Sequence, residues 1–289
     1  MVINNGNLLR VEAQDLDEHG KVVVPSGVVV VTEDAFVGLD AVTEIVFSEG
    51  VELVYGYALS DLPNLRSVTF PKSLKVLGGE HGYGPAVFNT KGVKVTMQSY
   101  PQFSKDCFGK QETIAYIKAC FKQIEELLKS STIEDVEKAI ECYNSIIHHK
   151  QHYKNLAEDF DNISYLIINK LKEKQDGKEI GKILIEKSLK NNKLLTPAFL
   201  QYDAYSVSEH LKLQETFKLI DFRYCDKYAM LVDDTHEIYF DIGTMQIRTQ
   251  KLTGKKEVDV LEQNLIMLHV LRHEISHLYQ KTRSENSTE

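Results

Sequence analysis

Apolar and polar positions repeat every 23 residues across residues 22–90 of this chain. Three turns start the repeat units, and each begins 23 residues after the one before: Pro25-Ser26-Gly27-Val28, Ser48-Glu49-Gly50-Val51 and Pro71-Lys72-Ser73-Leu74. Ala35 and Ala58 keep the same register. A unit of one short apolar strand and a turn cannot bury its apolar face alone, so units must stack to make a core. The pattern predicts a solenoid of three coils.

The repeat resembles the BspA-like class of leucine-rich repeats. The resemblance is carried by Val24-Pro25-Ser26-Gly27-Val28, by Asp34-Ala35-Phe36, and by the run from Leu65 to Pro71. Leu39 and Leu62 stand where that family usually has a small cysteine, and a glycine-rich stretch at residues 78–84 interrupts the third unit. The resemblance implies either a recognition surface for a protein partner or a scaffold for the rest of the chain.

The apolar period changes to 3.6 residues after Gln111, which predicts helices. One face of the first helix gathers Ile114, Ile117, Phe121, Ile124 and Leu128. Ser131 followed by Glu134 is typical of a capping box at the start of a second helix. Two more helices are predicted over residues 156–172 and 178–190. Residues 107–195 are therefore expected to form a helical region after a repeat module of residues 1–106.

Residues 196–289 predict a C-terminal domain that mixes helices and strands. A helix is expected over residues 208–219, followed by a β-hairpin of residues 228–232 and 237–242 that turns at Asp233-Asp234. Residues 245–250 are expected to add a third strand, and residues 258–281 a long helix. The predicted fold class is α+β.

The predicted C-terminal helix contains the motif His273-Glu274-Ile275-Ser276-His277. Residues four apart lie one turn apart on one helix face, so both imidazoles can bind a single Zn²⁺ at roughly 2.0–2.1 Å. Zinc lowers the pKa of a bound water to about 7, and Glu274 is the carboxylate beside the first ligand that can take the proton. The motif predicts His273 and His277 as metal ligands and Glu274 as the catalytic base.

The run Val270-Leu271-Arg272-His273-Glu274-Ile275-Ser276-His277-Leu278-Tyr279 resembles the extended motif of zincin metallopeptidases. The resemblance implies a zinc cofactor and a peptide or protein substrate. It also implies an edge strand that holds the substrate above the active-site helix, for which residues 238–245 are the expected strand.

The third zinc ligand of that family has no clear counterpart, because only 12 residues follow His277. Gln280 and Arg283 stand where the met-turn class requires a glycine and a histidine, which excludes that class. The ligand therefore comes from upstream, from another chain or from a longer parent protein. His236 and Asp241 are the upstream candidates, with Cys225 more distant; His269, one turn before His273, is expected to support the ligands without binding the ion.

A second histidine group, formed by His148, His149 and His152, also invites a metal hypothesis. His148 and His152 lie one turn apart on a helix, but no carboxylate of motif quality accompanies them. Protonated histidines interact favourably with the C-terminal end of a helix, and we expect that role here.

Charge and composition limit the partners of the chain. The net charge of −8 argues against a nucleic-acid-binding surface, which needs a basic face. No stretch predicts a signal peptide or a membrane span, and four cysteines without C-x-x-C spacing are typical of reduced thiols in a cytoplasm. Two hypotheses follow: an intracellular zinc-dependent hydrolase, most simply a metallopeptidase, or a protein-binding module with a degenerate, non-catalytic zincin-like helix.

Overall fold

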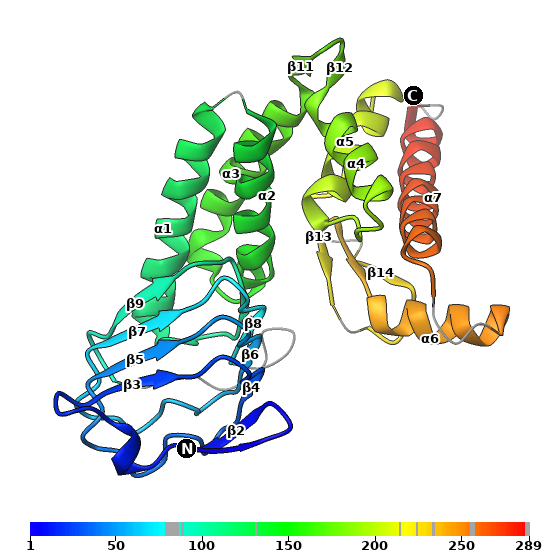
Figure 1. Ribbon diagram of the computed structural model, residues 1–289. Helices are drawn as coiled ribbons and strands as arrows, with labels where there is room; N and C mark the ends of the chain where they lie inside the picture. The colour runs from blue at the N-terminus through cyan, green and yellow to red at the C-terminus, as the bar shows by residue number, and fades with distance from the viewer. Residues whose placement is uncertain are drawn as a thin grey trace. The chain divides into compact units, whose positions relative to one another are not determined.

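The computed structural model describes residues 1–78, 87, 90–130, 132–213, 215–223, 225–232, 235–254 and 258–286. It is a mixed α+β protein with a solenoid-like β region first and helices later (Figure 1). The chain divides into two compact units, Met1–Lys122 with His149–Lys154 and Gln123–His148 with Asn155–Glu289. The three-part division proposed from the sequence stays a prediction.

The solenoid has two sheets, and each complete coil gives one strand to each of them (Figure 1). One sheet contains β3 (Lys21–Val24), β5 (Glu44–Phe47), β7 (Ser67–Phe70) and β9 (Lys94–Met97). The other contains β1 (Val2–Asn4), β2 (Asn7–Arg10), β4 (Val30–Val31), β6 (Leu53–Val54), β8 (Val76–Leu77) and β10 (Gln102–Phe103). All neighbouring strands are parallel except β1 and β2, and a 3₁₀ turn (Ala13–Asp15) links β2 to β3.

The strand register confirms the repeat. Val22, Ile45 and Val68 pair with one another across three strands, so the period of 23 residues is the length of one coil. Ala35 and Ala58 are 0% and 1% exposed. Val68 then pairs with Val95, which makes the next coil longer and adds β9 and β10 as a fourth coil. The sequence analysis stopped at residue 90 because this coil breaks the period.

Polar side chains join one coil to the next at the turns. The Glu49 carboxylate accepts hydrogen bonds from the backbone N–H groups of Lys72 (3.0 Å) and Ser73 (3.1 Å). The Asn64 side-chain amide donates to the Asp40 carbonyl at 2.9 Å. These bonds satisfy backbone groups that a turn leaves without a partner, and they hold neighbouring coils in register.

The predicted helices of the middle region are confirmed. They are α1 (Lys110–Lys129), α2 (Ile133–Ile146), α3 (Ala157–Lys172) and α4 (Ile180–Lys190), with 3₁₀ segments at Ile147–Gln151 and Lys154–Leu156 and a two-stranded ribbon of β11 (Lys174–Gln175) and β12 (Lys178–Glu179). Ile117, Phe121 and Ile124 are buried on α1, as the pattern predicted. In the second unit α2 packs against α3, α4 and α5 (Pro197–His210).

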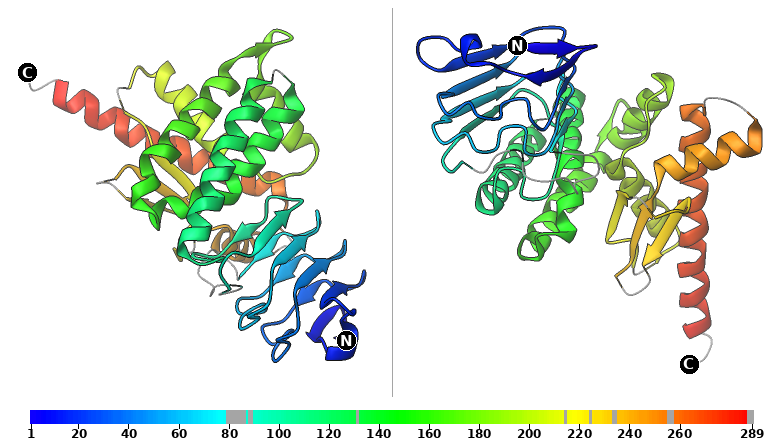
Figure 2. Two further views of the ribbon diagram at one scale, coloured as in Figure 1. Left: turned by 90° about the vertical axis from the view of Figure 1, so that its left-hand side faces the viewer. Right: turned by 90° about the horizontal axis from the view of Figure 1, so that it is seen from below.

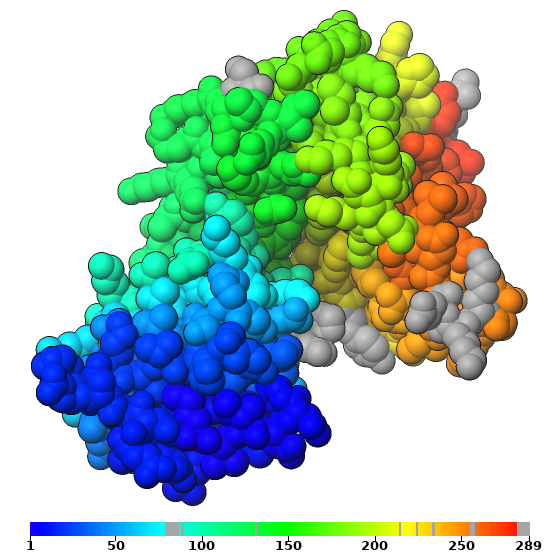
Figure 3. Space-filling model, in the orientation of Figure 1, coloured from blue at the N-terminus to red at the C-terminus, as the bar shows by residue number. Residues whose placement is uncertain are grey.

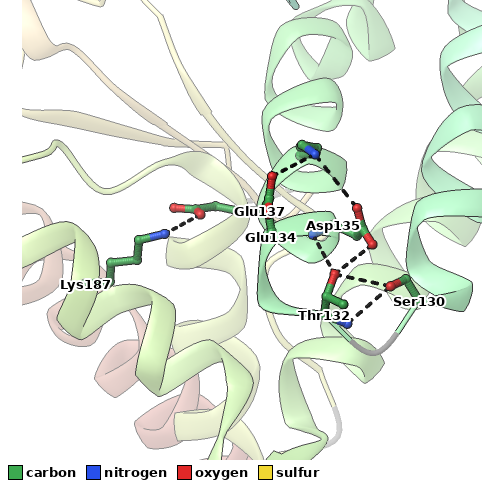
Figure 4. A network of polar contacts seen from close by, with 7 residues as sticks. Ser130, Thr132, Glu134, Asp135, Glu137 and Lys187 are labelled. Carbon is green, nitrogen blue, oxygen red and sulfur yellow. Dashed lines mark hydrogen bonds and ion pairs between the residues drawn. The ribbon is translucent and has the colours of Figure 1, made fainter.

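The cap of α2 differs from the predicted one by one residue. Thr132 is the N-cap, and its hydroxyl oxygen accepts a hydrogen bond from the backbone N–H of Asp135 at 3.3 Å (Figure 4). The same hydroxyl donates to the Asp135 carboxylate at 2.7 Å. The expected cap, Ser131, lies outside the described residues. A threonine that follows a serine offers the same chemistry, so the sequence pattern could not decide between them.

The C-terminal region has a three-stranded sheet in the order β13 (Leu219–Phe222), β15 (Glu237–Phe240), β14 (Ala229–Val232). The predicted hairpin of β14 and β15 is confirmed by their antiparallel register, while its Asp233-Asp234 turn lies outside the described residues. The helix predicted over residues 208–219 is wrong. Helix α5 ends at His210, Lys212 has a φ of +56°, and β13 begins at Leu219 and pairs in parallel with β15.

Two further expectations for this region are wrong. Residues 245–250 are part of α6 (Ile242–Thr253) and not a strand, because the Asp241 carboxylate accepts from the Thr244 N–H at 2.8 Å and starts a helix there. β15 therefore ends at Phe240, and it is the central strand of its sheet rather than the expected edge strand over residues 238–245. The long C-terminal helix is confirmed as α7 (Val260–Asn286).

Among the described helices, none is both long enough and apolar enough to cross a membrane.

Candidate metal centre

The buried face of α7 decides where the motif points. Met267, Leu271 and Ile275 follow at four-residue steps, and each is 0% exposed. His273 and His277 lie two residues before and after Ile275, and two residues turn a helix by about 200°. Both histidines are therefore on the opposite face, and both are exposed.

Two polar contacts fix α7 against α5. The side chain of Asn264, 1% exposed, accepts from the Leu195 N–H at 2.8 Å and donates to the Lys193 carbonyl at 3.1 Å. Eight residues further along each helix, Arg272 pairs with Asp203 at 3.1 Å. The two helices therefore run in the same direction, and the turn that carries His273 is held next to α5.

The two motif histidines converge. Their Nε2 atoms are 3.1 Å apart, with ring centroids 4.6 Å apart and ring planes at 85°. The Ser276 hydroxyl donates to the His273 carbonyl at 2.6 Å, within the same turn. The four-residue spacing thus brings two imidazole nitrogens to one point in front of the helix.

The distance between the two nitrogens fits a shared zinc ion. With Zn–N bonds of roughly 2.0–2.1 Å and tetrahedral angles, two ligand nitrogens lie about 3.3 Å apart. The observed 3.1 Å is close to that value. His273 and His277 would hold the ion through Nε2, which leaves Nδ1 of each ring for an orienting hydrogen bond.

Glu274 is half-buried on the turn between the two histidines. Within the described part of the chain its carboxylate makes no hydrogen bond or ion pair, so its oxygens are available to a proton. The carboxylate is the only acidic group of the motif, and its role as a base depends on a metal being present beside it.

The upstream candidates for a third ligand have other partners. His236 lies 3.3 Å from the Glu215 carboxylate, in a residue with a φ of +53°. The Asp241 carboxylate accepts from the N–H groups of Thr244 (2.8 Å) and Cys225 (2.9 Å). Burial alone would raise the pKa of Asp241, but these donors outweigh it and lower the pKa below its usual value.

No group of three His, Cys, Asp or Glu side chains able to hold a metal ion is found among the residues that the structure describes. The structure therefore brings together His273 and His277 and adds neither His236, Asp241 nor Cys225 to them. Cys225 has its sulfur 3.7 Å from the Lys227 carbonyl. His269 is exposed one turn before the pair.

The other histidine group has a packing role at its centre. His149 is 0% exposed, and its ring lies 4.3 Å from Phe103 and 5.9 Å from Tyr153 between ring centroids. His148 and His152 are half-buried on either side of it. An imidazole stacked among aromatic rings is typical of core packing, in line with the expectation that this group is not a metal site.

Sequence analysis missed one buried acid. Asp221 on β13 is 5% exposed and accepts a hydrogen bond from the Phe222 N–H at 2.8 Å. Burial raises the pKa of its carboxyl to about 7. The signal was present, since Asp221 interrupts the apolar run Leu219-Ile220-Asp221-Phe222, but that run was assigned to a helix end and a loop.

The solenoid has a hollow of about 570 Å³ near its first coil. Its floor includes Leu16 and Leu39, and Asp17, Glu18 and Asp40 line it. The Asp17 carboxylate is already engaged by the N–H groups of His19 and Lys21, both at 2.9 Å. These bonds shape the turn, so the hollow is first explained by the local fold.

No family model, curated protein or solved structure matches the chain significantly. The likeness to zincins and to BspA-like repeats therefore rests on the motif residues themselves.

Proposed function

We propose that the chain is a zinc-dependent hydrolase of the metallopeptidase type, with His273 and His277 as ligands and Glu274 as general base. The observation that supports this is the 3.1 Å separation of the two Nε2 atoms on the exposed face of α7. That separation suits one shared zinc ion, and the flanking residues resemble the extended zincin motif. A peptide or protein is the substrate class that this motif implies.

The chain's own residues divide the chemistry between them. His273 and His277 bind and orient through Nε2, and the packing of Ile275 and Leu271 keeps their turn rigid. Bound zinc supplies a water whose pKa is about 7. Glu274 accepts the proton of the attacking water and returns it to the leaving amine. A catalytic zinc site usually has three protein ligands, so one more donor is required.

The solenoid and the cysteines support two smaller parts of the proposal. We assign the solenoid, which resembles BspA-like repeats, to recognition of a protein partner or to a scaffold role. We assign the chain to a cytoplasm, because all four cysteines are unpaired and Cys107, Cys120 and Cys142 are buried.

A substitution of the base tests the activity. Glu274→Gln keeps the shape of the side chain but cannot take a proton, so zinc content and folding should be unchanged. Turnover of an unfolded peptide mixture, followed by mass spectrometry, should fall by about 10²–10⁴-fold. His269→Ala is the control, since it removes an exposed imidazole of the same helix outside the motif. Parental turnover in Glu274→Gln would rule out the proposed base.

A protein-binding module is the second candidate, and a specific observation favours it. β15, which should hold the substrate at a sheet edge, is an interior strand, and the described residues contribute only two ligands. Metal analysis separates the two candidates. A binding module with a degenerate helix should hold no zinc after dialysis against zinc-containing buffer and then against metal-free buffer, whereas a hydrolase should retain it.

A further inference from the structure

The motif histidines face away from the unit that carries them. Both rings are exposed, and the C-terminal turns of α7 extend beyond the neighbouring elements in both views of Figure 2. The space-filling view likewise shows atoms of α7 at the surface (Figure 3). Two nitrogens 3.1 Å apart are thus presented outward, where a second molecule can reach them.

The same face of α7 has apolar residues beside the pair. Ile266 and Val270 precede His273 and His277 by seven residues each, which is about two turns and places them on the same face. Both are half-buried. A second surface that approached the histidines would therefore also cover these two side chains.

We infer that a second copy of this chain completes the metal site, with His273 and His277 of both copies around one zinc ion on a two-fold axis. The inference rests on the proposed function, because it uses the same two ligands. Two nitrogens from each copy give the four ligands that zinc prefers in a tetrahedral arrangement. A two-fold contact needs only one surface, used twice, and it is the commonest symmetry of soluble oligomers.

Charge explains why this contact depends on metal. Each chain has a net charge of −8, so two copies repel each other. Neutral imidazoles leave the double positive charge of zinc in place at the contact, between the two acidic molecules. Association is therefore coupled to the ion, and removing the ion removes the attraction.

The shared site is compatible with hydrolysis after one change. Four imidazoles close the coordination shell, as in structural zinc sites. Release of one imidazole to water leaves three protein ligands and one open position, which is the composition of a catalytic site. The second copy thereby supplies the ligand that the described part of a single chain does not contain.

Light scattering coupled to size exclusion, with metal analysis of the same peak, tests the inference. The full chain in zinc should elute as a dimer with one zinc ion for every two chains, and EDTA should return it to monomers. His273→Ala should stay monomeric and lose zinc, while the control His269→Ala should behave like the parent. Circular dichroism checks that both variants fold, as expected for exposed residues.

The other outcomes separate this inference from the proposed function. A monomer that holds one zinc ion per chain would overturn the shared site and leave the hydrolase proposal standing. A chain that binds no zinc would overturn both. A dimer that persists in EDTA and in His273→Ala would also overturn the shared site, because another surface would then hold it together.

Discussion

The solenoid and the C-terminal region are stabilised in different ways. In the solenoid, equivalent residues of successive coils touch: Phe47 stacks on Phe70 with ring centroids 5.3 Å apart, in the register that also pairs Val22 with Ile45. In the C-terminal region, single buried polar side chains such as Asn264 and Asp241 each join several segments. A contact in the solenoid has similar contacts above and below it. A contact in the C-terminal region has no second copy.

This difference predicts how damage spreads. Each coil contacts only its neighbours, so a defect in the solenoid should weaken nearby coils and leave distant ones folded. A defect at a single polar contact of the C-terminal region should loosen every segment that the contact joins. Hydrogen exchange measured by mass spectrometry reports the two units separately and shows which of these happens.

The largest effect is expected at Gly20, in the first coil. Its φ is +79°, and a Cβ there would lie 2.2 Å from the Ala41 carbonyl oxygen. Gly20→Ala combines backbone strain with a backbone clash and should lower the free energy of unfolding by about 3–5 kcal/mol. Exchange should rise in the first coils, while the second unit stays protected.

Gly38→Ala is the matched control for Gly20. Its φ is +78°, but a Cβ there would meet no heavy atom within 4 Å. Only the backbone strain remains, so the loss should be about 1–2 kcal/mol. Equal losses in the two variants would show that the close approach of Gly20 to Ala41 is unimportant.

The same difference explains how much could be predicted from the sequence. The coil length and the inward positions of Ala35 and Ala58 were correct, because the sequence states the same rule three times. The convergence of His273 and His277 follows from helix geometry alone, so their spacing was sufficient. β13 was missed because it has four residues and pairs in parallel with β15, and its pattern appears once. The third ligand is a tertiary feature, and no local spacing encodes it.

The second prediction uses Asp221, the buried acid of β13. Its folded pKa is about 7, above the value of about 3.9 in an unfolded chain. The carboxyl therefore opposes folding increasingly as the pH rises from about 4 to about 7. Asp221→Asn keeps the acceptor for the Phe222 N–H and removes the ionisation. It should be about 2–4 kcal/mol more stable than the parent at pH 8, with that advantage absent near pH 4.

Urea unfolding at several pH values measures this difference. Asp226→Asn is the control, because it removes an exposed carboxyl from the same unit and should leave the pH dependence as in the parent. The gain in Asp221→Asn should appear as protection of β13, β14 and β15, which the strand pairing joins. A pH profile identical to that of the parent would mean that Asp221 is not ionised by burial-dependent titration in this range.

The smallest effect concerns the cap of α2, where sequence and structure name neighbouring residues. Thr132→Ala removes the hydroxyl that accepts from the Asp135 N–H and should lower the free energy of unfolding by about 1 kcal/mol, whereas Thr132→Ser should be neutral. Lys187→Ala, which breaks a partly exposed ion pair with Glu137, should matter less. Ser131→Ala decides between the two caps: a larger loss there than in Thr132→Ala would restore the cap predicted from sequence. It would also show that a local pattern, although it occurs once, outweighs the arrangement found around Thr132.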